Sequence, residues 1–253
     1  MEVFQDYAYY YNAFYNNKNY AAEAGQIDML LKRYKGVTCE KIINYGCGTG
    51  KHDIELSKLG YHCTGIDMSQ AMIDKAIASA MQEQLSIRFV VADVRSYEPK
   101  EKYDAVISMF HVMSYQNRNE DLLAALKSAR KALDKNGLFI FDAWYGPGVL
   151  TDKPVVRVKE LETADNKLVR VAKPVMHDQT NIVDVCYEVL VINKETNETK
   201  VINEIHNMRY FFRPELEFYL REAGFELLDN LDCMTLGKTS YDSWTSYFIA
   251  KAI

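Results

Sequence analysis

The stretch KIINYGCGTGKHDIEL, residues 41–56, places three glycines between an apolar run and an amphipathic run. The apolar run predicts a strand and the amphipathic run predicts a helix, so Gly46, Gly48 and Gly50 would form the turn between them. Glycine has no Cβ and tolerates positive φ, which lets a ligand lie directly against the backbone. In open α/β sheets, ligands bind beyond the carboxyl ends of the strands, where this turn would lie.

Apolar runs and helical patterns alternate from residue 40 to residue 145. Strands are predicted at 41–46, 61–67, 87–93, 103–110 and 138–145, and helices at 51–59, from the residue after Ser69 through Met81, and at 119–137. Ser69 is the expected N-cap of the second helix, Asn119 that of the third, and Gly60 and Gly137 the expected helix stops. Such alternation with short connections indicates an α/β fold, a mostly parallel sheet with helices on both faces.

The pattern changes after residue 150. Residues 155–212 contain four strand-like runs separated by turns, without a helical pattern, and this predicts an antiparallel β insertion after strand five. A helix that begins near Pro214 and two final strands complete the chain. We therefore expect an N-terminal aromatic segment at 1–30, a sheet domain at 31–150 and 208–253, and the insertion at 151–207.

Composition excludes several classes of protein. The net charge of the 253 residues is −5, without a stripe of lysine and arginine, which disfavours nucleic-acid binding. No run approaches the roughly 18 apolar residues of a membrane helix, and we expect no signal peptide. The five cysteines form no C-x-x-C pair, which favours reduced thiols in a cytoplasmic protein. The histidines have no ligand spacing, so no catalytic metal is expected.

The glycine turn and two aspartates together predict a nucleoside ligand. Lys51 occupies the place of the third glycine in a dinucleotide fingerprint, and the ending of a P-loop is absent. Asp67 closes the second strand, where a carboxylate can accept hydrogen bonds from ribose hydroxyls, although it could also cap the next helix. Asp93 closes the third strand and could accept from the amino group of adenine.

Four segments, INYGCGTGKH, GIDMSQAMIDKA, VVADVRSY and YDAVISMF, resemble the successive motifs of class I S-adenosylmethionine-dependent methyltransferases. The resemblance implies a Rossmann-like fold and S-adenosylmethionine as the cofactor. It places Asp67 on the ribose and Met68 on the adenine. The other cofactor-binding residues that it implies are Gly46, Cys47, Gly48 and Gly50 at the methionine part, Asp93 and Val94 at the adenine edge, and Met109 beside the methyl group.

The segment YYNAFYNNKNYAAEAGQI is similar to the start of sugar N,N-dimethyltransferases of the desosamine and mycaminose type. The segments ISMFHVMSY, FDAWYGPGV and NMRYFFRPELEFYLREAGF also resemble that group, whose members act on amino sugars linked to a nucleotide diphosphate. The resemblance implies that Tyr11 and Tyr20 close over the cofactor. It also implies that Tyr115, Trp144 and Tyr145 face a small-molecule acceptor.

Methyl transfer needs positioning, and a hydroxyl acceptor also needs a base. His111, which follows the fourth strand, is the candidate base. The aromatic start (Tyr7, Tyr11, Tyr15) would be either a helix on the core or a lid that excludes water, and we favour the lid. Arg209 and Arg213 are candidates for a diphosphate.

The alternatives to N-methylation are O-methylation of a sugar hydroxyl or other small phosphorylated metabolite, a dehydrogenase, and a non-catalytic cofactor-binding subunit. A protein or nucleic-acid methyltransferase is disfavoured by the acidic balance. We expect neither a nucleic acid nor a membrane as partner. A homodimer is one expectation, since exposed strand edges often pair.

Overall fold

The protein was analysed as a computed structural model, which describes residues 10, 13–15, 18–36 and 39–253. Its central sheet has the parallel order β3-β2-β1-β4-β5, in which Ile42 of β1 pairs with Cys63 of β2 and Ala105 of β4. The antiparallel strand β11 lies between β5 and β10. These strands are β1 (Lys41–Tyr45), β2 (His62–Asp67), β3 (Arg88–Val91), β4 (Tyr103–Ser108), β5 (Leu133–Tyr145), β10 (Phe225–Asp232) and β11 (Thr245–Ala252).

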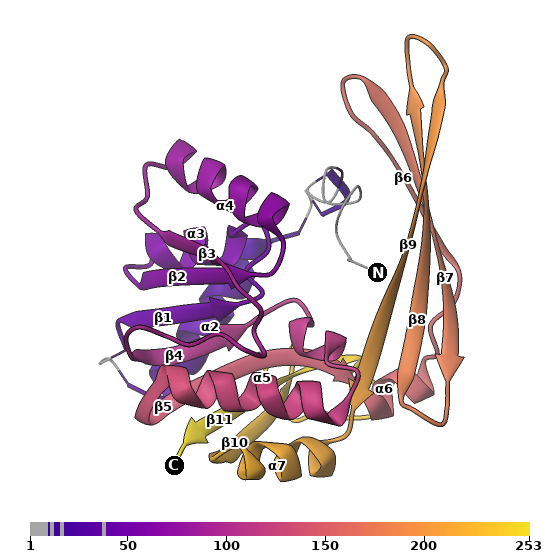
Figure 1. The fold of residues 1–253 in the computed structure, drawn as a ribbon. Coiled ribbons are helices and arrows are strands. Elements are labelled where there is room, and N and C mark those ends of the chain that lie inside the picture. The colour runs from indigo at the N-terminus through magenta and orange to yellow at the C-terminus, as the bar shows by residue number, and fades with distance from the viewer. Residues whose placement is uncertain (1–9, 11–12, 16–17, 37–38) are drawn as a thin grey trace.

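Helices cover both faces of this sheet (Figure 1). They are α2 (Tyr20–Tyr34), α3 (Lys51–Lys58), α4 (Gln70–Gln82), α5 (Asn119–Ala132), α6 (Gly146–Thr151), α7 (Arg213–Glu222) and the 3₁₀ helix η1 (Val112–Tyr115). Alternate side chains of β1 point to opposite faces of the sheet. Ile42 packs with Leu31 of α2, and Ile43 packs in the core that includes Leu126 of α5. The predicted mostly parallel sheet is therefore confirmed.

Local signals predicted two helix ends correctly and missed two. The Ser69 side chain accepts a hydrogen bond from Met72 N, and Gly60, with φ +98°, follows the last turn of α3. The prediction that α5 runs to Gly137 was wrong, because Leu133 is already extended and pairs with Tyr103 of β4. Asn119 is the first residue of α5 and not its cap. Strand pairing thus ends this helix before the glycine stop is reached.

The predicted antiparallel insertion is confirmed as the meander β6-β7-β8-β9, which stands to one side of the central sheet in Figure 1. Its strands are β6 (Arg157–Glu162), β7 (Asn166–His177), β8 (Ile182–Asn193) and β9 (Thr199–Phe211). β9 continues past the expected boundary at residue 207 and pairs with the end of β5, with Tyr210 beside Trp144. One continuous strand therefore fixes the insertion to the carboxyl end of the central sheet.

The described N-terminal residues lie between the central sheet and the insertion (Figure 1). Phe14 is fully buried against Leu168 of β7 and Val189 of β8. From Tyr20 the chain is the helix α2, which packs on the central sheet, so the N-terminal segment gives way to the sheet domain before residue 30. Tyr7 and Tyr11 lie outside the described residues.

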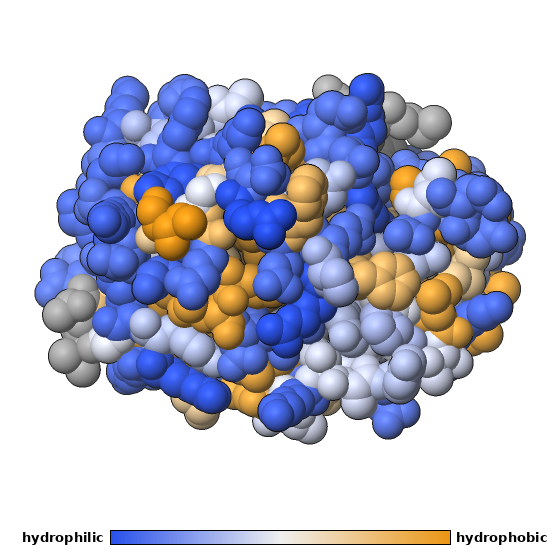
Figure 2. Space-filling view, turned by 90° about the horizontal axis from the view of Figure 1, so that it is seen from below, coloured by the Kyte–Doolittle hydropathy of each residue, from blue (hydrophilic) through white to orange (hydrophobic). Residues whose placement is uncertain are grey.

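The surface, the cysteines and the helix lengths bear on the expectations from composition. The face in Figure 2 is mainly hydrophilic, with hydrophobic residues in small groups. All five cysteines are free thiols. No helix within the described ranges has the length and apolar character needed to span a membrane.

Candidate active site

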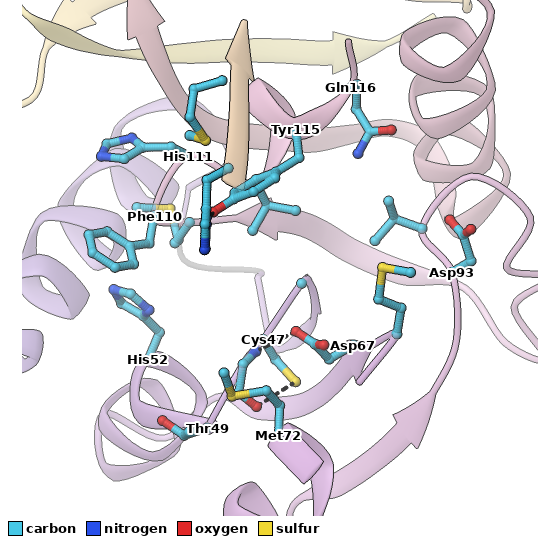
Figure 3. A pocket seen from close by; sticks show the side chains of 18 of the residues that line it. Cys47, Thr49, His52, Asp67, Met72, Asp93, Phe110, His111, Tyr115 and Gln116 are labelled. Carbon is cyan, nitrogen blue, oxygen red and sulfur yellow. Dashed lines mark hydrogen bonds between the residues drawn. The ribbon is translucent and has the colours of Figure 1, made fainter. Parts of the chain in front are cut away.

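A cavity of about 460 Å³ lies beyond the carboxyl ends of the parallel strands, as the glycine turn predicts. Its walls come from the turn after β1, the ends of β2 and β3, the loop after β4, η1, and the inner face of β8 and β9. In Figure 3, Cys47 and Asp67 lie on one side of the cavity, and Tyr115 and Gln116 lie across from them. The cavity therefore has a half formed by the sheet domain and a half to which the insertion contributes.

The glycine turn is held by its backbone. Gly46 N and Cys47 N both donate to Ile66 O at 2.8 Å, and Gly48 N donates to Asp67 Oδ2 at 2.9 Å. Gly46 and Gly48 have φ of +72° and +55°. A Cβ added to Gly46 would lie 2.5 Å from Val112, whereas a Cβ on Gly48 would meet nothing within 4 Å. The space over Gly48 is thus open for a ligand that approaches the backbone.

Asp67 joins this turn to the start of α4. Its Oδ1 accepts from Ser69 N at 2.9 Å and its Oδ2 from Gly48 N, so it supports both loops at once. Burial raises the pKa of Asp67 even though these two hydrogen bonds favour the charged form. Each carboxylate oxygen has a second lone pair, so Asp67 can still accept from ligand hydroxyls. Met68, next to it, is 66% exposed and lines the cavity.

Asp93 lies at the far edge of the same half and is held by Arg95. The Arg95 Nε donates to both Asp93 oxygens at 3.0 Å, and Arg95 also reaches Asp121 at 3.1 Å. Hydrogen bonding from Arg95 lowers the pKa of Asp93, so this side chain is an ionised acceptor. Val94 and Met109 are almost fully buried and give the wall its apolar surface.

Tyr20 covers the glycine turn from the start of α2. Its ring lies edge-on to the His52 ring at 5.0 Å, and His52 Nε2 lies 2.6 Å from Glu23 Oε2. Burial alone would raise the pKa of Glu23, but His52 and Lys18 lower it below its ordinary value. Lys18 pairs with Glu23 and lies 4.4 Å from the centre of the Phe110 ring. This network fixes the described N-terminal residues against the cavity.

His111 follows β4 in a left-handed conformation, with φ +66°, as does Phe110 with φ +67°. Its backbone N–H donates to Asp142 Oδ1 at 2.9 Å, and its ring Nδ1 lies 2.8 Å from Asp142 Oδ2. Burial would raise the pKa of Asp142, but His111 lowers it. Two adjacent residues in this costly region of φ/ψ are a feature that clusters at functional sites. A buried carboxylate that orients a histidine is also the arrangement expected for a general base.

The half of the cavity to which the insertion contributes brings Tyr115 and Trp144 together with residues that sequence reasoning missed. These are Val185, Tyr187, His206, Asn207 and Met208. The strand patterns of β8 and β9 already placed these alternate residues on common faces, with Asn207 at the margin. Only the pairing of β9 with β5 shows which face turns toward the cavity.

Two of the predicted site residues lie in the second layer. Tyr145 does not line the cavity, and its hydroxyl oxygen accepts from Thr239 at 3.4 Å. Gly50 is the N-cap residue of α3, and a Cβ there would lie 2.7 Å from the Phe89 ring, so it serves packing beneath the turn. Tyr11 lies outside the described residues.

The expectation that Arg209 meets a diphosphate is not supported. Arg209 is 6% exposed, pairs with Glu215 and donates to Asn119 Oδ1 at 2.8 Å, so it ties β9 to α5 and α7. Arg213 does not line the cavity either.

The sheet-domain half fits S-adenosylmethionine on its own geometry. The turn leaves open space over Gly48 for a chain that lies against the backbone. Asp67 offers a partly buried acceptor for hydroxyl groups, and Met68, Val94 and Met109 offer apolar surface for a ring and for a sulfur substituent. Within the described ranges, no group of three or more His, Cys, Asp or Glu side chains is arranged to hold a metal ion.

Residues 42–137 match a family described as methyltransferase domain. Among curated proteins, the chain is similar to dTDP-3-amino-3,4,6-trideoxy-alpha-D-glucopyranose N,N-dimethyltransferase of Streptomyces venezuelae. The two are 26% identical over 228 residues, which is 88% of this chain and 91% of that protein. A protein named as a methyltransferase in Geobacillus sp. (strain WCH70) is 27% identical over 140 residues, 55% of this chain and 57% of that protein, so the chain spans little more than half the length of this relative.

A crystal structure of an S-adenosylmethionine-dependent methyltransferase from Clostridium acetobutylicum ATCC 824 has a similar fold. The TM-score is 0.83 at 19% identity, and the match covers 99% of both chains. Because the match covers the whole chain, the insertion and the central sheet are arranged alike in both proteins.

Proposed function

We propose that this chain is an S-adenosylmethionine-dependent methyltransferase that methylates the amino nitrogen of a nucleotide-linked sugar. The observation that carries the proposal is the division of the cavity. One half fits the cofactor, and the other presents Tyr115, Trp144 and His206 as a wall of aromatic and hydrogen-bonding groups. The relative from Streptomyces venezuelae, which matches over nearly its full length, is named for a substrate of this class.

The cofactor supplies a methyl group bonded to a positively charged sulfur, which a nucleophile takes by in-line displacement. The residues of the chain bind and orient. Asp67, Gly48 and Met68 line the cavity. Asp67 would accept hydrogen bonds from the ribose hydroxyls, Gly48 would lie against the methionine part, and Met68 would pack on the adenine. Tyr20 and Phe110 exclude water from the reacting groups, since both line the cavity and Lys18 lies near both rings.

The half of the cavity that carries Tyr115 and Trp144, here called the acceptor half, would position the sugar. The rings of Trp144 and Tyr115 offer flat apolar surfaces, and the hydroxyl of Tyr115 and the amide of Asn207 offer hydrogen bonds. Trp144 is itself held by an edge contact with Trp244 at 4.6 Å. Such positioning can lower the barrier of a bimolecular reaction by roughly 7–11 kcal/mol. Because the leaving group is already activated, positioning is the main contribution that the protein has to make.

O-methylation of a sugar hydroxyl is a second candidate function, and the pairing of His111 with Asp142 favours it. A hydroxyl is a poor nucleophile until a base takes its proton, and His111 is a histidine oriented by a carboxylate beside the cavity. Under this second candidate, His111 would be the catalytic base.

The test is transfer of a labelled methyl group from S-adenosylmethionine to dTDP-3-amino-3,4,6-trideoxy-α-D-glucopyranose by the purified protein. We expect the label in the sugar nucleotide and S-adenosylhomocysteine as the second product. Binding of S-adenosylhomocysteine without transfer to this sugar would contradict the proposal while leaving the cofactor assignment intact.

A further inference from the structure

His206 and Glu204 lie two residues apart on β9, so their side chains share one face of the insertion. In the antiparallel pairing, His206 lies opposite Val185, and Glu204 lies opposite Tyr187. Val185 and Tyr187 line the cavity, and so does His206, although it is only 3% exposed. The insertion therefore presents a buried histidine to the acceptor half, with a carboxylate behind it, from a strand far in sequence from the glycine turn.

The His206 ring bridges Tyr115 and Glu204. The Tyr115 Oη lies 2.6 Å from His206 Nδ1, and His206 Nε2 lies 3.2 Å from Glu204 Oε2. A carboxylate only accepts, so Nε2 carries the proton and Nδ1 accepts from the Tyr115 hydroxyl. The Tyr187 ring packs edge-on to the imidazole at 4.9 Å and helps to fix its plane.

We propose that Tyr115, His206 and Glu204 form a proton relay that takes the proton of the acceptor amine, an inference that rests on the proposed N-methylation. Tyr115 would touch the acceptor and is the catalytic residue of the relay. His206 and Glu204 act through it and are positioning residues.

The relay conserves protons and charge. The amine enters as an ammonium ion, and one of its N–H groups donates to Tyr115 Oη. That proton passes to Tyr115 as the phenolic proton passes to His206 Nδ1, which leaves a neutral amine and an imidazolium held by Glu204. Rotation about the C–N bond turns the freed lone pair toward the methyl carbon, the new N–C bond forms, and the C–S bond breaks with its electron pair on sulfur.

His111 is less well placed for this step. In Figure 3 the rings of His111 and Phe110 lie at one side of the cavity, and Tyr115 lies nearer its centre. The His111–Asp142 pair also belongs to the sheet domain rather than to the insertion. The relay therefore differs from the His111–Asp142 pair in its place in the cavity.

The experiment measures kcat against pH for His206→Gln, with dTDP-3-amino-3,4,6-trideoxy-α-D-glucopyranose as the probe. We expect kcat to fall roughly 100-fold at pH 6.5, in line with the value of a positioned base. The loss should shrink toward pH 9, since the amine then arrives neutral. Tyr115→Phe should behave in the same way. The kcat of the double variant should be no lower than that of either single variant, because each of the three variants breaks the same relay.

His177→Gln is the matched control. His177 makes the same kind of pair, with Nε2 2.8 Å from Asp184 Oδ2, on the same insertion, but it is exposed and away from the cavity. It should keep the kcat of the unaltered protein at every pH. An equal loss at all pH values in His206→Gln would show a purely structural role and overturn the relay.

A second readout does not depend on turnover. In ¹⁵N NMR of histidine-labelled protein, we expect His206 as the neutral form protonated at Nε2, with the Nδ1 signal shifted in Tyr115→Phe. A proton on Nδ1 would mean that His206 donates to Tyr115 and cannot accept from it, which overturns the relay even if the unaltered protein does not methylate this sugar. Failure of the methylation itself, with the expected tautomer present, would instead count against the proposed acceptor.

Discussion

Asp142 holds His111 at two points, with Oδ1 2.9 Å from the backbone nitrogen and Oδ2 2.8 Å from the ring Nδ1. The first contact helps to keep His111 in its left-handed conformation, and the second is a close ion-pair contact that lies outside hydrogen-bond geometry. The cavity thus carries two histidines with carboxylate partners, His111 from the sheet domain and His206 from the insertion. The proton relay assigns the proton of the acceptor amine to the second of them.

His111→Ala separates the two candidate chemistries. If the acceptor is an amine, we expect kcat to fall by less than about fivefold, because positioning supplies most of the rate. The affinity for S-adenosylhomocysteine, measured by calorimetry, should be unchanged. For a hydroxyl acceptor the base is worth roughly 10²–10⁴ in rate, so a loss of that size would point to O-methylation instead.

Gly48→Ala tests the open space over the turn. We expect it to weaken S-adenosylhomocysteine binding by more than about tenfold, because the new Cβ takes space that the ligand needs. Gly60→Ala is the control: Gly60 also has positive φ, at +98°, and its added Cβ also meets nothing within 4 Å. Both variants should lose about 1–2 kcal/mol of stability from the left-handed backbone. Equal binding losses in the two would refute the assignment of the turn.

Asp53 should give folding stability a distinctive pH dependence. It is fully buried in α3, accepts from Asn44 Nδ2 at 2.8 Å, and burial raises its pKa to about 7. Between pH 4 and pH 7 the folded state therefore holds a proton that the unfolded state has lost, and stability falls as pH rises. The span of about three pKa units corresponds to about 4 kcal/mol. Urea unfolding of Asp53→Asn should lack this decline; an unchanged profile would contradict the assignment.

Phe14→Ala tests the lid. Phe14 is fully buried against the insertion, and Tyr15, which follows it, lines the cavity and contacts the Phe110 ring edge-on at 5.1 Å. We expect turnover to fall by about tenfold or more, because release of this anchor lets water reach the reacting groups. Phe218→Ala, at a half-exposed phenylalanine of α7, should have little effect. Turnover in Phe14→Ala equal to that of the unaltered protein would refute the lid.

Sequence reasoning succeeded where the signal is local. Ser69 and Gly60 mark helix ends through their own backbone and side chain, and Asp67 lies at the end of a strand whose parallel pairing fixes its place. It failed where a distant pairing decides. Leu133 joins β5 rather than α5 because β4 lies beside it.

The acceptor half could not be predicted for the same reason. The alternation of β9 places His206 and Glu204 on one face, but the face that meets Tyr115 is set by contacts more than ninety residues apart along the chain. Tyr145 was predicted to face the acceptor but does not line the cavity. It follows Trp144 directly, so the alternation of strand side chains turns it away from the cavity.

The most direct test of the central claim is mass spectrometry of the products formed from two matched acceptors, the amino sugar nucleotide and the same sugar with a hydroxyl at that carbon. The account predicts a gain of one or two methylene masses on the amino sugar and none on the hydroxyl sugar. A gain on the hydroxyl sugar alone would contradict it and would make His111 the base. If neither sugar gains mass while S-adenosylhomocysteine still binds, the sugar would be excluded as the acceptor and only the assignment of the cofactor would stand.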